Sequence, residues 1–175
     1  MKWKRTVYNT LFVIIAVFFV YLAWKTIKEL FVAPKPEIVL TSYVEPTVSR
    51  WDIMYEAIKI CESGNNPQAR NSQSTATGDI QALEVYVRDA NRILGEEYFT
   101  LDCRTDPVKT RYMFDIIQGF YNPGQNIHKA IISHYLGPGN FSRKSIIGDW
   151  YYRKVIRTMA QIENEYKKHN YKIIP

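Results

Sequence analysis

Apolar residues recur at helical spacing over most of the chain beyond Ser49, which predicts a mainly α domain. In the first stripe Trp51, Met54, Ile58 and Cys61 stand at i, i+3, i+7 and i+10, so they share one face of a helix. The same criterion predicts further helices over residues 82–94, 107–121 and 125–136, and a closing helix that ends near residue 169.

Polar and glycine residues at the ends of these stripes support the helix assignments. Ser49 followed by Asp52 is typical of a capping box, in which the serine side chain accepts a hydrogen bond from the first turn. Gly64 and Gly95 follow the first two stripes, where glycine is the usual helix stop. Asp106 precedes a proline, the pairing that commonly begins a helix. The first helix is therefore expected to end one or two residues before Gly64.

The N-terminal region has a different pattern, an apolar run without any charge over residues 6–24. As a helix this run would extend roughly 28 Å, close to the thickness of a bilayer core. Lysine and arginine are enriched before it, which favours the N-terminus inside and the rest of the chain outside. A cleaved signal peptide is the alternative, but a good small-x-small cleavage site is missing.

These patterns divide the chain into five predicted parts. They are an inner N-terminus (1–5), a transmembrane helix (6–24), an extended tether with prolines (25–48), a helical domain (49–168) and a tail (169–175). The expected fold is one helical domain preceded by one transmembrane helix, since 175 residues support little more.

Charge and cysteine content exclude several classes of function. The formal net charge of +6 is divided equally, with +3 before residue 49 and +3 from residue 49 onward, so no concentrated basic face points to a nucleic-acid partner. Cys61 and Cys103 form no Cys-x-x-Cys motif, so we predict neither a metal site nor a cofactor. The two cysteines form either one disulfide or two free thiols, and the sequence leaves both open.

Glu62 is the residue whose position suggests chemistry. It stands in the last turn of the first predicted helix and directly after its apolar stripe. The helix dipole and an apolar setting both disfavour a charged carboxylate there. A carboxyl group that keeps its proton is what a general acid needs. An ordinary exposed helix-end residue is the alternative on this local evidence.

Residues 62–69 (ESGNNPQA) resemble the E-S-x-x-N-P-x-A motif of lysozyme-like lytic transglycosylases of the soluble type. Residues 76–81 (ATGDIQ) are similar to that family's A-x-G-L-M-Q, with Asp79 where the family has leucine. The resemblance implies that Glu62 is the catalytic acid and base, that Ser63 supports it, and that Gln81 lines the glycan groove.

Two later segments continue the resemblance. Residues 133–140 (SHYLGPGN) are similar to the family's A-Y-N-A-G-P-G-x, with His134 and Tyr135 where the family has tyrosine and asparagine. Residues 151–155 (YYRKV) resemble Y-V-x-K-V, which implies that Tyr151 lies near the acid, although the usual preceding E-T is missing. The central region looks more like phage-type members. The resemblance thus gives five candidate substrate-binding residues, namely Ser63, Gln81, His134, Tyr135 and Tyr151.

The resemblance implies a lysozyme-like domain that cleaves the β-1,4 bond between N-acetylmuramic acid and N-acetylglucosamine and leaves a 1,6-anhydro product. The expected partners are peptidoglycan strands and, through the N-terminal helix, a membrane. The expected location of the domain is the periplasmic or extracytoplasmic side, or a virion membrane, where it would open the wall locally as part of an envelope or virion assembly. Two alternatives are a hydrolytic muramidase on the same fold, in which Asp79 or another acid handles water, and an inactive wall-binding or assembly protein.

Overall fold

The computed structural model describes residues 17–26, 45–140 and 146–175. The chain divides into two units, residues 1–43 and 44–175, and each is described by itself. In the first unit residues 17–26 are helical. Within the described ranges no helix combines the length and apolar character needed to cross a bilayer. Residues 6–16 of the predicted span, and residues 27–44 of the predicted tether, lie outside these ranges.

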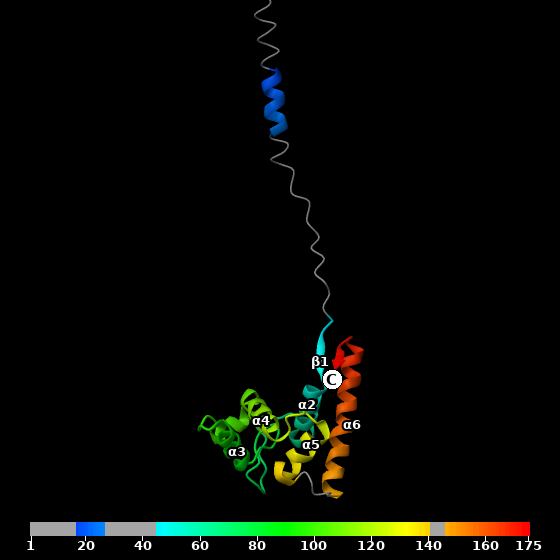
Figure 1. Ribbon diagram of the computed structural model, residues 1–175. Helices are drawn as coiled ribbons and strands as arrows, with labels where there is room; N and C mark the ends of the chain where they lie inside the picture. The colour runs from blue at the N-terminus through cyan, green and yellow to red at the C-terminus, as the bar shows by residue number, and fades with distance from the viewer. Residues whose placement is uncertain (1–16, 27–44, 141–145) are drawn as a thin grey trace, which may run out of the picture. The chain divides into compact units, whose positions relative to one another are not determined.

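The second unit is mainly helical, as predicted (Figure 1). Its elements in chain order are β1 (Thr47–Ser49), α2 (Arg50–Ser63), α3 (Glu84–Leu94), η1 (Leu101–Thr105), α4 (Pro107–Tyr121), α5 (Ile127–Leu136), η2 (Pro138–Asn140), α6 (Ile146–Lys168) and β2 (Lys172–Ile174). The five helices predicted for this unit all exist, and their ends fall within two residues of the expected positions wherever both are defined.

The predicted capping residues explain where α2 and α4 begin and end. The Ser49 hydroxyl accepts a hydrogen bond from the Asp52 amide at 3.0 Å and donates one to the Asp52 carboxylate at 2.6 Å. Gly64 adopts the left-handed conformation at φ 65° and closes α2 through its own N–H. At α4 the Asp106 side chain accepts from two backbone amides of the first turn. Local sequence therefore determines the last turn of α2, where Glu62 lies.

The two short strands extend the folded unit beyond the predicted domain. β1 pairs with β2 in parallel, with Val48 opposite Ile173. Residues 47 and 48 had been expected in the tether and residues 169–175 in a tail. Val48 and Ile173 instead pack against the main core, because both are apolar and face α2 and α6.

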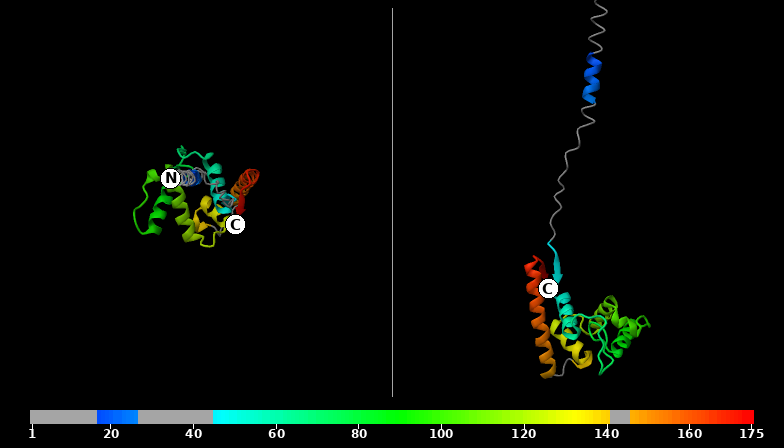
Figure 2. Two further views of the ribbon diagram at one scale, coloured as in Figure 1. Left: turned by 90° about the horizontal axis from the view of Figure 1, so that it is seen from above. Right: turned by 180° about the vertical axis from the view of Figure 1, so that it is seen from behind.

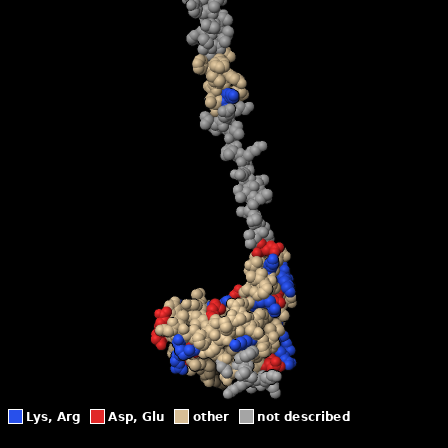
Figure 3. Space-filling view, viewed as in Figure 1, with Lys and Arg blue, Asp and Glu red and all other residues tan. Residues whose placement is uncertain are grey.

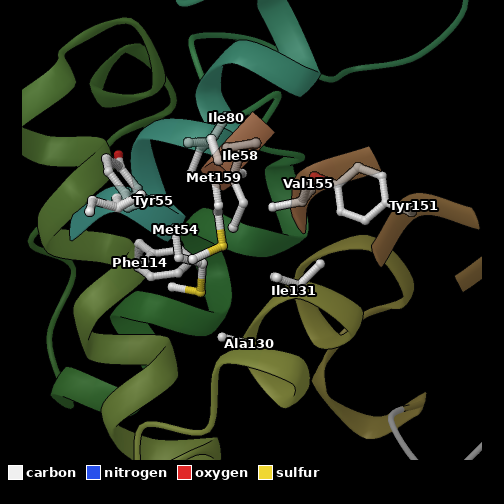
Figure 4. Packing of buried hydrophobic residues seen from close by; sticks show 13 residues of the cluster. Met54, Tyr55, Ile58, Ile80, Phe114, Ala130, Ile131, Tyr151, Val155 and Met159 are labelled. Carbon is white, nitrogen blue, oxygen red and sulfur yellow. The ribbon is translucent and has the colours of Figure 1, made fainter. Parts of the chain in front are cut away.

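The main core lies between α2, α4, α5 and α6 (Figure 4). α6 runs alongside α2 and α5, which Figures 1 and 2 show from different directions. Figure 4 shows the side chains that fill this space, and the fully buried ones include Met54, Ile58, Phe114, Ile131 and Val155. Burying a side chain of this kind stabilises the fold by about 1.5–3 kcal/mol.

A second, smaller core joins α3 to α4 and consists of Val87, Ala90, Phe99, Met113 and Ile117. α4 contributes to both cores, because its Phe114 belongs to the main one. The unit is thus built as two packed clusters that share one helix, an arrangement that leaves room for a cleft where the clusters meet.

Charged side chains of both signs are interspersed over the face of the second unit shown in Figure 3. Uncharged side chains cover most of the middle of this face, and neither sign of charge is confined to a single patch of it.

Candidate active site

A cleft of about 670 Å³ lies where the two cores meet. Its walls come from the end of α2, the loop between α2 and α3, and parts of α3, α4 and α5. The lining residues are Glu62, Asn71, Ala76, Ile80, Gln81, Ala82, Leu83, Val85, Tyr86, Asp89, Ile117, Gln118, Ser133, His134, Tyr135, Leu136, Gly137 and Pro138. Segments that are far apart in sequence therefore converge on this space, and Glu62 is at its wall.

The Glu62 carboxylate is held by a tyrosine. The Tyr151 hydroxyl donates a hydrogen bond to Glu62 Oε1 at 2.6 Å, between residues 89 positions apart in the chain. Tyr151 is only 3% exposed, and the Glu62 side chain is 20% exposed. Burial, followed by the Glu62 charge, raises the pKa of Tyr151 well above its usual range. The phenol therefore stays protonated and keeps donating to the carboxylate.

His134 is the second polar neighbour of Glu62. Its Nε2 atom lies 3.8 Å from Glu62 Oε1, and its side chain is 6% exposed. Burial lowers the pKa of His134, although the Glu62 charge and the backbone of Ile80 act in the opposite direction. A neutral imidazole near pH 7 follows, so the contact with Glu62 is not an ion pair. The Nδ1 atom is buried and lacks a hydrogen-bond partner among the described residues.

Tyr135 covers Tyr151. The two rings are stacked, with centroids 4.5 Å apart and an interplanar angle of 14°. Unlike Tyr151, Tyr135 lines the cleft and is 41% exposed. Tyr135 therefore packs on the ring whose hydroxyl holds Glu62 and also contributes to the wall of the cleft.

Ser63 and Gln81 have different roles in the loop that follows α2. The Ser63 hydroxyl donates to the Asp79 carbonyl at 2.8 Å and accepts from the Asn66 amide at 3.0 Å, and Ser63 does not line the cleft. Gln81 does line it, with its amide nitrogen donating to the Gly78 carbonyl at 2.9 Å. Ser63 thus fixes the loop next to Glu62, whereas Gln81 presents a side chain to the cleft.

Asp79 points into the protein interior. It is 1% exposed, and its Oδ1 accepts from the Ile80 amide at 2.9 Å and from the Thr110 hydroxyl at 3.1 Å. Burial raises the pKa of Asp79 above its usual range, against the hydrogen bond from Thr110. Asp79 is not among the cleft-lining residues, so the second acid considered for a hydrolase has no access to the cleft in this structure.

The other carboxylate at the cleft is Asp89, which the sequence analysis had not selected. It forms an ion pair with Arg92 at 2.7 Å and also accepts from the Tyr121 hydroxyl at 3.4 Å. Arg92 balances the charge of Asp89 and Tyr121 donates a hydrogen bond to it, so Asp89 has a structural role on α3.

Sequence reasoning also missed polar groups on the buried sides of α3, α4 and α5. Tyr86, Gln118 and Ser133 line the cleft, and the buried hydroxyl of Tyr86 lacks a partner among the described residues. A signal existed in the sequence, because Gln118 stands on the same helix face as the apolar stripe of its helix. A polar residue in an apolar stripe indicates a buried polar contact.

Neither cysteine participates in the cleft. Cys61 and Cys103 are free thiols, which resolves the alternative that the sequence left open. Over residues 17–26, 45–140 and 146–175, no group of three or more histidine, cysteine, aspartate or glutamate side chains is placed to hold a metal ion.

Comparison with protein-family models, curated proteins and solved structures gives no match for this chain.

Proposed function

We propose that the chain is a peptidoglycan lytic transglycosylase with a lysozyme-like domain, in which Glu62 is the single catalytic acid and base. The observation that carries the proposal is the Tyr151 hydroxyl, 2.6 Å from a Glu62 carboxylate at the wall of a 670 Å³ cleft. A general acid needs this combination of access to substrate and a fixed orientation.

In the proposed reaction Glu62 donates its proton to the oxygen of the β-1,4 bond as the bond from that oxygen to C1 breaks. The resulting Glu62 carboxylate then accepts the proton of the C6 hydroxyl of the same muramic acid residue, and O6 bonds to C1. Glu62 gives up one proton and receives one back, so it is regenerated and water is not consumed. Tyr151 holds one carboxylate oxygen throughout, because its hydroxyl stays protonated.

The environment of the other carboxylates favours this reaction over hydrolysis. Retaining and inverting hydrolases place a second carboxylate about 5–9.5 Å from the acid, free to act on the sugar or on water. Asp79 is buried against Thr110 and away from the cleft, and Asp89 is paired with Arg92. A hydrolytic muramidase is the second candidate, and it would need an acid other than Asp79, because Asp79 does not line the cleft.

The lysozyme-like fold is part of the proposal. It is supported by a helix that ends in the proposed acid, by the loop with isolated β-bridges at Arg70, Thr77 and Ala82 that follows, and by a cleft between two cores. The agreement between this layout and the motif resemblance of Glu62, Gln81 and Tyr151 strengthens both.

We also propose that residues 6–24 anchor the chain in a membrane with the domain outside the cytoplasm, where it would meet peptidoglycan. The support is the uncharged apolar run and the lysines and arginine before it. The full-length chain expressed in bacteria should sediment with membranes and resist alkaline extraction, whereas the chain from residue 45 onward should not. Equal sedimentation of both would contradict the anchor.

The test of the proposed acid compares two glutamates of the same helix. Glu62→Gln should abolish clearing of purified cell walls, with a loss of at least about a hundredfold, since general acid–base catalysis contributes that much or more. Glu56→Gln is the matched control, because Glu56 forms an ion pair with Lys59 and does not line the cleft. Unchanged clearing by Glu62→Gln would exclude the proposed role.

A further inference from the structure

The exposed ring of Tyr135 is a feature of the cleft that the acid–base chemistry does not use. Its contact with Tyr151 is a parallel stack, so one face of the Tyr135 ring is covered. The residue remains 41% exposed and lines the cleft beside Glu62. Buried aromatic rings usually have both faces packed, so a ring with an accessible surface in a cleft has contact area to offer a ligand.

The ligand that suits this surface is a pyranose ring. A hexopyranose has flat faces of C–H groups whose hydrogens carry partial positive charge, and an aromatic face carries the negative part of its quadrupole. Hydroxyl and acetamido groups project from the rim of the sugar, where Gln81, Gln118 and the Gly137 backbone also line the cleft.

We propose that Tyr135 is a sugar-stacking residue that binds a pyranose ring of the glycan next to the bond cleaved by Glu62, an inference that rests on the proposed function. The Tyr151 ring behind it keeps Tyr135 flat against the wall, because the two are stacked at 14°. Tyr151 in turn is fixed by its hydrogen bond to Glu62. The ring behind Tyr135 is therefore held in place by a contact that Tyr135 does not make.

Glycan-binding measurements with a catalytically inactive variant test the inference. The parent is full-length Glu62→Gln, and the probes are the tetramer of N-acetylglucosamine and solubilised peptidoglycan strands, titrated calorimetrically. Tyr135→Phe keeps the ring and should change Kd by less than about threefold. Tyr135→Leu keeps apolar bulk without an aromatic face and should raise Kd about tenfold, the equivalent of one stacking contact.

Tyr112→Leu is the matched control. Tyr112 is similarly exposed at 45% but belongs to an aromatic cluster with Tyr98 and Phe99 outside the cleft lining. It should leave Kd unchanged. In the chain with Glu62 intact, Tyr135→Leu should raise KM far more than it lowers kcat, a split that a general loosening of the fold would not produce.

The outcomes separate this inference from the proposed function. If the wild-type chain cuts cell walls and Tyr135→Leu binds as tightly as its parent, the stacking role is overturned and the proposed function stands. If the wild type does not cut and the Glu62→Gln parent binds neither probe, both fail together. A tenfold loss confined to Tyr135→Leu, with Tyr135→Phe and Tyr112→Leu unchanged, supports the stacking role.

Discussion

At the scale of single residues, the proposed chemistry depends on how the protein surrounds one carboxyl group. Glu62 receives a hydrogen bond from Tyr151 and lies beside a neutral, buried His134. The neighbouring Asp79 is withdrawn into the interior. These environments, rather than the residue types themselves, distinguish the proposed acid from the other carboxylates.

Tyr151→Phe tests the hydrogen bond to Glu62. Removing the hydroxyl should lower kcat by about 10–100-fold, since a hydrogen bond to a charged group contributes about 1.5–3 kcal/mol. Tyr152→Phe is the control, because Tyr152 contacts the His128 ring and lies outside the cleft lining. Equal activity of Tyr151→Phe and wild type would show that Glu62 does not need this partner.

Asp79→Asn tests the buried carboxyl through the pH dependence of stability. The pKa of Asp79 is raised in the folded state, so its contribution to stability is fully present below the unfolded pKa of about 3.9 and is lost as pH rises through the folded pKa. Asparagine cannot ionise. The unfolding free energy of Asp79→Asn relative to wild type should therefore increase from acidic to neutral pH. A pH-independent difference in chemical denaturation would contradict this assignment.

At the scale of elements, the loop between α2 and α3 carries the cleft wall and depends on one glycine. Gly78 has φ 87°, and a Cβ at this position would lie 1.7 Å from the Arg104 carbonyl oxygen. The loop can therefore approach η1 only because residue 78 lacks a side chain.

Gly78→Ala should destabilise the unit by at least about 3 kcal/mol, because both the positive φ and the clash oppose it. Gly119→Ala in α4 is the control, since open space surrounds its Cβ position. That variant should gain up to about 1 kcal/mol from helix propensity. Thermal unfolding of the two variants measures the difference, and similar midpoints would refute the close approach.

The sequence predicted helices well because their signals are local. Apolar periodicity and the caps at Ser49, Gly64 and Asp106 act within a few residues, and each was found as expected. Strand pairing between segments far apart in the sequence was not predictable in this way. β1 and β2 are too short to show a strand pattern, and they pair across more than a hundred residues.

The residues of the candidate site are far apart in the sequence, and only the motif resemblance predicted that they lie close together. The resemblance selected Glu62, His134, Tyr135, Gln81 and Tyr151, and the structure brings these residues to one cleft or to direct contact with Glu62. It also selected Ser63, whose hydroxyl stabilises the loop instead. Nothing in the periodicity revealed that the ring at position 135 would stack on the ring at position 151.

At the scale of the whole molecule, the proposed function assigns wall cutting to the second unit and membrane anchoring to residues 6–24. Within the second unit, the parallel pairing of β1 and β2 ties the start of the domain to its end next to α2 and α6. The strands therefore belong to the fold that positions the cleft.

Ile173→Asp tests this closure. Ile173 packs against the main core, so an aspartate there should destabilise the unit by about 2–3 kcal/mol. Ile174→Asp is the control, because Ile174 is 40% exposed and alternates to the other side of the strand. It should change stability by less than about 0.5 kcal/mol. Equal thermal midpoints for the two variants would show that β2 does not contribute to the fold.

The most direct test of the proposed transglycosylase activity is the mass of the products released from purified peptidoglycan by the wild-type chain. The proposed reaction should release muropeptides that end in 1,6-anhydro-N-acetylmuramic acid, because O6 replaces water in the reaction at C1. Glu56→Gln should release the same products, and Glu62→Gln should release none. Products one water molecule heavier, with free reducing ends, would contradict the transglycosylase and favour a hydrolase.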